Sequence, residues 1–164
     1  MEGRRKLTKF KHSLIIASAV LDFIEAESRR AVRTETGGVL VGHGEFDSGE
    51  LIITGASGPG PLARKTKYSF ARDTQYCQQY LDESAKDSLG LVDYAGEWHK
   101  HHEIDPWPSW QDISTLKNIA VSPDYHVSVP VLLIIGQSNL RESLRAFVVS
   151  DAGVLMVVKW EARM

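Results

Sequence analysis

The sequence predicts one α/β domain in which a helix-flanked sheet is completed by a meander of strands. Three observations support this prediction. The chain has 164 residues, a length that suits a single domain with its own hydrophobic core. Compact apolar runs, typical of buried strands, alternate with stretches whose apolar residues recur at helical spacing. From residue 126 onward, three further apolar runs follow one another with no helical pattern between them.

The amino-terminal part predicts a strand, a helix and two more strands. Residues 11–18, KHSLIIAS, form a short apolar run that favours a strand. Residues 19–32 place apolar side chains at helical spacing with charges between them, which indicates an amphipathic helix. Residues 34–45 become compactly apolar after two glycines, and residues 49–61 form a second such run ending in Gly and Pro. We expect both runs to be strands.

The middle of the chain predicts a loop followed by a helix. The Gly/Pro-rich stretch continues through LARKTKYSF to residue 70, and we expect it to be a mobile or partner-facing loop. Residues 71–90 follow a helical pattern that begins near Arg72, takes Asp73 as its cap and stops at Gly90.

The carboxy-terminal part predicts a strand, a helix and the meander. Residues 91–101 favour a strand, and residues 109–122 favour a helix that Pro123 ends. We expect the meander to consist of three further strands, at residues 126–137, 142–151 and 153–160.

Composition excludes several classes of function. The formal net charge is −2, from 19 basic and 21 acidic residues, so nothing draws the whole protein to nucleic acid or to a membrane surface. No apolar run reaches the roughly 20 residues of a membrane span, and the start does not resemble a signal peptide. The basic opening, residues 1–12, is expected to be a solvated end. The single cysteine, Cys77, cannot form an internal disulfide, which favours the cytoplasm, and we expect it to pack in a helix.

A histidine cluster in GEWHKHHEIDPWPSWQD, residues 96–112, suggests a metal site. Alternate residues of a strand share a face, so His99 and His101 point the same way and Lys100 points away. Two imidazoles so placed can both reach a zinc ion. A helical pairing of His99 with His102 is disfavoured by the nearby prolines.

A third ligand is available from the helix that follows. Ser109 is placed to cap this helix, which puts Asp112 in its first turn. The intervening loop can carry Asp112 back over the strand end, giving two nitrogens, one oxygen and an open coordination position, as catalytic zinc requires. Two simpler interpretations exist: Ser-x-x-Asp can be only a capping box, and the histidines can be surface residues.

The order His-x-His, seven residues, then Ser-x-x-Asp resembles the signature of the JAB/JAMM (MPN-domain) metallopeptidases. That family also has a glutamate far upstream, at the entrance to a glycine-bearing strand, and Glu35 in ETGGVLVG matches it. The order of elements matches as well, so the resemblance covers nearly the whole chain. It implies one JAB/JAMM domain over residues 1–164, with a mixed, curved β-sheet flanked by helices.

The resemblance also implies a mechanism. His99, His101 and Asp112 would bind one catalytic zinc ion, Glu35 would act as general base on its bound water, and Ser109 would stabilise the oxyanion. A zinc ion lowers the pKa of its water and polarises a carbonyl, and a carboxylate beside it can relay the proton to the leaving amine. A hydroxyl donor meets the charge that develops in the transition state.

Several neighbours are not assigned by the resemblance. Many members carry proline directly after the second histidine, where this chain has His102. We interpret His102 as an ordinary loop residue, and the alternatives are that it supports a metal ligand or binds metal itself. We expect Trp98 to pack in the core, while the role of Glu97 stays open. Trp107 and Trp110 could line a groove for a peptide tail, although Trp110 could equally pack under the helix.

The resemblance implies a protein substrate with an extended C-terminal tail. Family members mostly cleave amide bonds at the C-terminus of ubiquitin or ubiquitin-like proteins. This chain is most similar to the stand-alone prokaryotic branch, and within it to deconjugating peptidases of bacterial CBASS anti-phage operons, which release a nucleotidyltransferase (CD-NTase) from its targets. A separate E1/E2-like protein would then perform the conjugation. The alternatives are processing of a sulfur-carrier protein's C-terminus, cleavage of cell-wall or phage-tail peptides, and a non-catalytic MPN scaffold.

Overall fold

The computed structural model of the protein describes residues 12–137, 139, 141–150 and 153–164. The basic opening stretch therefore lies, apart from its last residue, outside the described residues. The helices are α1 (Ser18–Arg30), α2 (Thr74–Asp87) and α3 (Trp110–Val121). The strands are β1 (Ser13–Ala17), β2 (Thr36–Gly44), β3 (Glu50–Ala56), β4 (Arg64–Lys65), β5 (Phe70–Ala71), β6 (Asp93–Lys100), β7 (Val131–Ile135), β8 (Arg145–Val149), β9 (Leu155–Val158) and β10 (Trp160–Arg163). No helix within the described ranges is long and apolar enough to cross a membrane.

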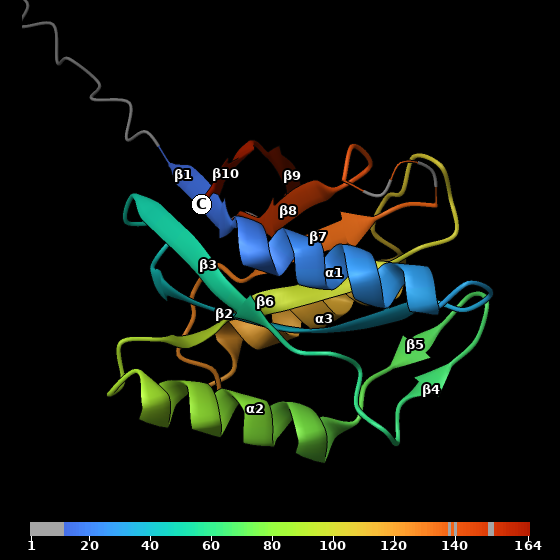
Figure 1. The fold of residues 1–164 in the computed structure, drawn as a ribbon. Helices are drawn as coiled ribbons and strands as arrows, with labels where there is room; N and C mark the ends of the chain where they lie inside the picture. Colours follow the sequence, from blue (N-terminus) through green and yellow to red (C-terminus); the bar gives the residue numbers. More distant parts are fainter. Residues whose placement is uncertain (1–11, 138, 140, 151–152) are drawn as a thin grey trace, which may run out of the picture.

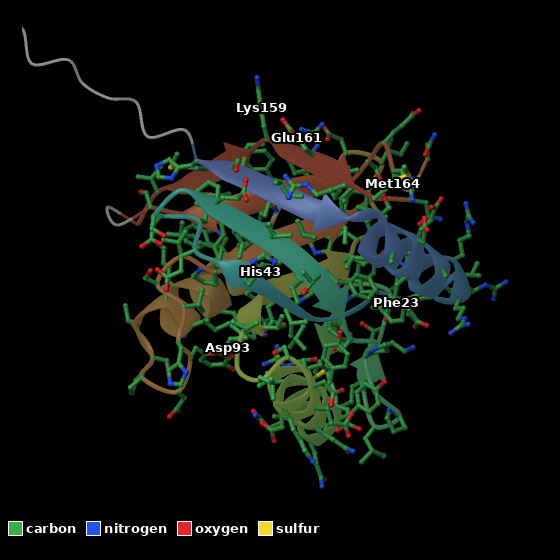
Figure 2. The ribbon with its side chains drawn as sticks, turned by 60° about the vertical axis from the view of Figure 1, so that its left-hand side comes forward. Phe23, His43, Asp93, Lys159, Glu161 and Met164 are labelled. Carbon is green, nitrogen blue, oxygen red and sulfur yellow. The ribbon has the colours of Figure 1, made fainter. Side chains whose placement is uncertain are left out.

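Eight strands form one mixed sheet in the order β10-β1-β3-β2-β6-β7-β8-β9. β1 pairs in parallel with β3 and β10, and β6 pairs in parallel with β7, while the other neighbours are antiparallel. β9 and β10 are separated by Lys159 alone, yet they pair at opposite ends of the strand order. The sheet therefore curls until its two ends nearly meet. In Figure 2, Lys159 and Glu161 lie beside β1, where this end of the chain returns.

The helices lie on different faces of this curved sheet (Figure 1). α1 packs over one face, where Leu21 and Ile24 join a buried cluster with Trp98 of β6. α3 packs on the other face, where Leu116 contacts a cluster that includes Phe147. Because successive side chains of a strand point to opposite faces, β7 serves both cores: Val131, Leu133 and Ile135 join the α1 side, whereas Leu132 and Ile134 join the α3 side.

The structure confirms the predicted fold class, a mixed, curved sheet flanked by helices, and every predicted helix and strand is present. Several boundaries were wrong. β7 begins only after Pro130, which has no N–H to donate to a sheet. The helix predicted over residues 71–90 begins at Thr74 with Asp73 as its cap, so Arg72 lies before the helix. The predicted last strand is two strands, because Trp160 leaves the β8 side of the sheet and joins β1.

The stretch predicted to be a loop before residue 70 contains a small hairpin instead. β4 and β5 form a separate two-stranded sheet. A main-chain bond holds its turn against the body of the protein, because the N–H of Glu35 donates to Thr66 O at 2.7 Å. A second bond joins the segments that flank the hairpin, because the N–H of Asp73 donates to Pro59 O at 2.8 Å. These tertiary bonds leave no periodic signal in so short a segment, which explains why the sequence pattern missed it.

Candidate metal centre

From Glu97 to the end of β6, and at His101 directly after it, the odd-numbered residues face one side of the sheet, as the sequence predicts. His99 and His101 lie on that side with ring centroids 6.4 Å apart. The side chain of His101 is 7% exposed and that of His99 is 18% exposed, so both are largely withdrawn from solvent. Trp98 points the other way and is fully buried, which confirms its packing role.

The start of α3 brings a carboxylate to these histidines. Ser109 is the N-cap: its hydroxyl accepts from the Asp112 N–H at 3.1 Å, while Asp112 Oδ2 accepts from the Ser109 N–H at 2.8 Å. The capping box is therefore present, yet it does not exclude a second role. Asp112 Oδ1 lies 3.0 Å from His99 Nδ1, and Asp112 Oδ2 lies 3.3 Å from His101 Nε2. Capping fixes the carboxylate where both imidazoles converge.

The donor set fits a zinc ion. One ligand atom each from His99, His101 and Asp112 lies within 4.8 Å of the others. Zinc binds imidazole nitrogen and carboxylate oxygen at about 2.0–2.2 Å and often takes three protein ligands in catalytic sites. The metal-ligand roles themselves stay predictions.

The charge on Asp112 also suits a metal ligand. Burial disfavours a charged Asp112, but hydrogen bonds from His101, His99 and the Ser109 N–H outweigh it and lower the pKa of Asp112. Burial likewise opposes protonation of His101, yet the Asp112 carboxylate, with a smaller effect of Glu35, raises the pKa of His101. Asp112 is therefore ionised at neutral pH, as a carboxylate ligand must be.

Glu35 lies at the entrance to β2, in the same cleft. Burial raises the pKa of Glu35 above its ordinary value, while the nearby His101 opposes this rise. The main-chain N–H of Glu35 donates to the carbonyl of Thr66, in the turn of the β4–β5 hairpin. A contact outside the eight-stranded sheet therefore fixes the backbone of Glu35. The structure thus brings Glu35 together with the three predicted ligands, and a partly buried carboxylate with a raised pKa suits proton transfer.

A glycine of the adjacent strand makes room for the His99 ring. β2 pairs Gly37 with His99, and a Cβ on Gly37 would lie 2.3 Å from Trp98 O and 2.8 Å from His99 Cδ2. It would also lie 2.9 Å from the ring of Phe70, which contacts His99 edge-on. Gly37 therefore allows the Phe70 ring and the His99 imidazole to pack directly over the strand.

All of these groups open onto one cleft of about 290 Å³. One wall is the hairpin end and the start of α2, and the other is the start of α3. The lining includes every predicted site residue: Glu35, Ser109, His99, His101 and Asp112. His102 lies outside the cluster and contacts Gln137 Oε1 at 2.6 Å, in agreement with its interpretation as a loop residue.

The two tryptophans near the cleft differ from each other. Trp110 is 86% exposed and does not pack under α3. Trp107 is 56% exposed and contacts Phe147 edge-on, with ring centroids 5.2 Å apart.

The sequence did not predict that Arg72 and Glu97 pair in the cleft. Arg72 forms an ion pair with Glu97, and both line the cleft. Glu97 occupies the same face of β6 as His99 and His101, so the strand alternation could have placed it. Its partner lies 25 residues away in the chain, and no local pattern joins them.

Comparison with known proteins decides the family. The family described as prokaryotic homologs of the JAB domain matches residues 17–149. The chain belongs to this family. The matched residues include every residue of the candidate centre. The protein is accordingly a hydrolase of the JAMM type.

Curated relatives of this JAB-domain protein include enzymes. It is 32% identical, over 76% of its length and 68% of the relative, to a protein of Enterobacter hormaechei subsp. hoffmannii named CD-NTase/cGAS isopeptidase. An Escherichia coli protein of the same name is 29% identical, with 79% of each chain covered. A probable metalloprotease of Sinorhizobium fredii is 29% identical, with 73% of each chain covered.

A solved structure supports the fold alone. The solution structure of a Desulfitobacterium hafniense protein has a TM-score of 0.67 and covers 92% of each chain, at 16% identity.

Proposed function

We propose that the protein is a zinc-dependent isopeptidase that cleaves the amide bond after the C-terminus of a conjugated protein tail. The observation that carries this proposal is the convergence of His99, His101 and Asp112 in one cleft with the partly buried Glu35. The family and the names of the relatives support a metal-dependent peptidase.

Each residue has a chemical task in this proposal. His99, His101 and Asp112 would hold the ion, which when bound makes water a stronger acid and polarises the scissile carbonyl. Glu35 accepts a proton from the attacking water and returns it to the leaving amine, a task for which a raised pKa is suited. The Ser109 hydroxyl accepts from the Asp112 N–H, so its own proton remains available to the carbonyl oxygen as negative charge develops there.

The proposed substrate is a nucleotidyltransferase of the CD-NTase type, joined through its C-terminus to a target protein. Three curated relatives bear the name CD-NTase/cGAS isopeptidase. In this proposal the protein reverses conjugation made by a separate E1/E2-like protein, in the cytoplasm, as part of an anti-phage system. A cleft of about 290 Å³ between a hairpin and a helix start suits an extended tail better than a folded domain.

A cleavage assay tests the proposal. Purified protein would be incubated with amide-linked fusions carrying a CD-NTase tail, a ubiquitin-like tail or a sulfur-carrier tail, with and without chelator. Glu35→Gln is the matched control, because it keeps the shape of the side chain and removes its basicity. We expect wild type to cleave the CD-NTase fusion, chelation to abolish cleavage, and zinc to restore it.

Glu35→Gln should retain the metal and lose about 100- to 10,000-fold in turnover, the usual contribution of a general base. Loss of metal from this variant would show that Glu35 is a ligand. Cleavage of the sulfur-carrier tail alone would replace the proposed substrate with that one. No cleavage of any fusion by the zinc-loaded protein would favour a binding scaffold.

A further inference from the structure

We propose that Arg72 is a substrate-binding residue that donates hydrogen bonds to a main-chain carbonyl of the tail, and that Glu97 and Tyr125 hold it in position. This inference rests on the proposed function, because it assigns a part of the same cleft to the same substrate. It concerns the end of the cleft away from His101, where no proposed chemical role requires a charged pair.

Arg72 is fixed by contacts from two other parts of the chain. It follows β5 and precedes the N-cap of α2, and its Nη1 donates to Glu97 Oε1. Its Nη2 donates to the hydroxyl of Tyr125, which follows α3, at 3.2 Å. Tyr94 donates to the same Glu97 oxygen at 2.8 Å, and the Tyr94 and Tyr125 rings pack with centroids 4.7 Å apart. The guanidinium is therefore held in one orientation.

This network is buried but open toward the cleft. The Glu97 side chain is 6% exposed, the Arg72 side chain is 21% exposed, and both line the cleft with His99. A guanidinium carries more N–H donors than the two that these contacts use. Because Arg72 borders the cleft, its remaining donors are accessible to a molecule bound there.

The charge balance favours a neutral acceptor. Glu97 already neutralises Arg72, so a substrate carboxylate would meet little net positive charge at this point. A peptide carbonyl needs only a donor in the right place, and a preorganised guanidinium supplies one at little entropic cost. A buried ion pair is costly to desolvate and is not a general means of stabilising a fold, which favours a functional reason for placing one at the cleft.

The spacing suits an extended tail. Glu97 and His99 are alternate residues on one face of β6, which places their Cα atoms roughly 6.6 Å apart. An extended tail has the same rise per residue. With its scissile carbonyl at the metal centre, a second carbonyl about two residues along the tail would reach Arg72.

Steady-state kinetics on the amide-linked fusion that wild type cleaves would test this role. We expect Arg72→Gln to raise KM about 10- to 100-fold, the effect of losing a hydrogen bond to a charged donor, with metal content unchanged. Arg29→Gln is the matched control, because Arg29 forms an exposed pair with Glu25 on α1 and should leave KM unchanged. Arg72→Lys covers the case in which Arg72→Gln does not fold, since it keeps a charge for Glu97 but has fewer donors.

A thioamide scan of the tail separates direct contact from a structural role. Replacing a carbonyl oxygen by sulfur weakens it as an acceptor, so one position near the second residue from the scissile bond should weaken binding to a Glu35→Gln protein. The same replacement should have no effect in the Glu35→Gln/Arg72→Lys protein. Equal effects in both proteins, or an unchanged KM in both Arg72 variants, would overturn the inference while leaving the proposed function intact. Failure of wild type to cleave or bind any fusion would overturn the proposed function, and this inference with it.

Discussion

The two sides of β6 serve different purposes. Toward the cleft the strand presents Glu97 and His99, followed directly by His101. These side chains meet polar groups from α3 and from the segment before α2. Toward α1 it presents Trp98, which is fully buried in the larger core, and Lys100, whose Nζ donates to Ser28 O and Ala31 O at 2.9 and 2.6 Å. The cleft side of β6 therefore holds the candidate site residues, and the other side packs against α1.

This contrast shows how packing on one side of a strand can support a polar cluster on the other side. Groups on the cleft side are polar, close together and partly desolvated, which costs folding free energy. The opposite side supplies the burial and hydrogen bonds that offset this cost, from side chains only one residue away. Substitutions on the two sides should therefore separate metal binding and turnover from stability.

The largest expected effect is on the cleft side, from Asp112→Asn. An amide oxygen can still accept from the Ser109 N–H, so the helix cap should survive, but the negative oxygen ligand is lost. We expect the purified variant to lack stoichiometric metal and measurable turnover, while its thermal unfolding stays close to that of metal-free wild type. Full metal occupancy would remove Asp112 from the ligand set, and global unfolding would mean that its structural role dominates.

On the other side, Trp98→Ala should give the largest loss of stability. It would leave a cavity in the core that contains α1 and would remove the indole donor to Ser57 O at 2.9 Å. Large-to-small changes of this kind typically cost about 3–5 kcal/mol. Denaturant unfolding would measure the loss, and metal content per folded molecule should match wild type. A metal-deficient but stable variant would show that the two sides of β6 are not independent.

Lys100→Met should have a smaller effect of the same kind. It would leave two carbonyls near the end of α1 without their charged donor, at a cost of about 1–3 kcal/mol. Burial lowers the pKa of Lys100, so over the alkaline range the unfolded state binds more protons than the folded state. Wild-type stability should therefore gain a contribution from this group as the pH rises, and the variant should lack that gain. Lys100→Arg is the charged control.

The sequence could predict those parts of the site that depend on short-range order. Strand alternation places His99 and His101 together, and a cap at Ser109 places Asp112 in the first turn of α3; the structure has both features. The position of Glu35 came from family resemblance, because no local pattern links it to residues more than sixty positions away. The contact of Arg72 with Tyr125 spans 53 residues and was missed for the same reason.

The errors in the fold have a similar cause. The β4–β5 hairpin is held by a bond from Glu35 to its turn, and its flanks are joined by the bond between Asp73 and Pro59. The break at Lys159 arises because the sheet curls, so that one continuous apolar run pairs first with β8 and then with β1. Periodicity reports which face a residue takes, but it does not report which distant strand lies beside it.

The smallest expected effect on stability is at Ser109. Substitutions there can separate the role of this residue in capping α3 from its proposed role in turnover. Ser109→Ala should cost about 1 kcal/mol, because the cap acceptor for the Asp112 N–H is lost, whereas Ser109→Gly should cost only a few tenths. If the hydroxyl also donates to the developing oxyanion, kcat should fall in both variants alike, by about 100-fold or more, with metal content unchanged. Ser109→Thr keeps both functions and is the control. A fall in kcat that follows the loss of stability, large for Ala and slight for Gly, would instead assign Ser109 to the helix cap alone.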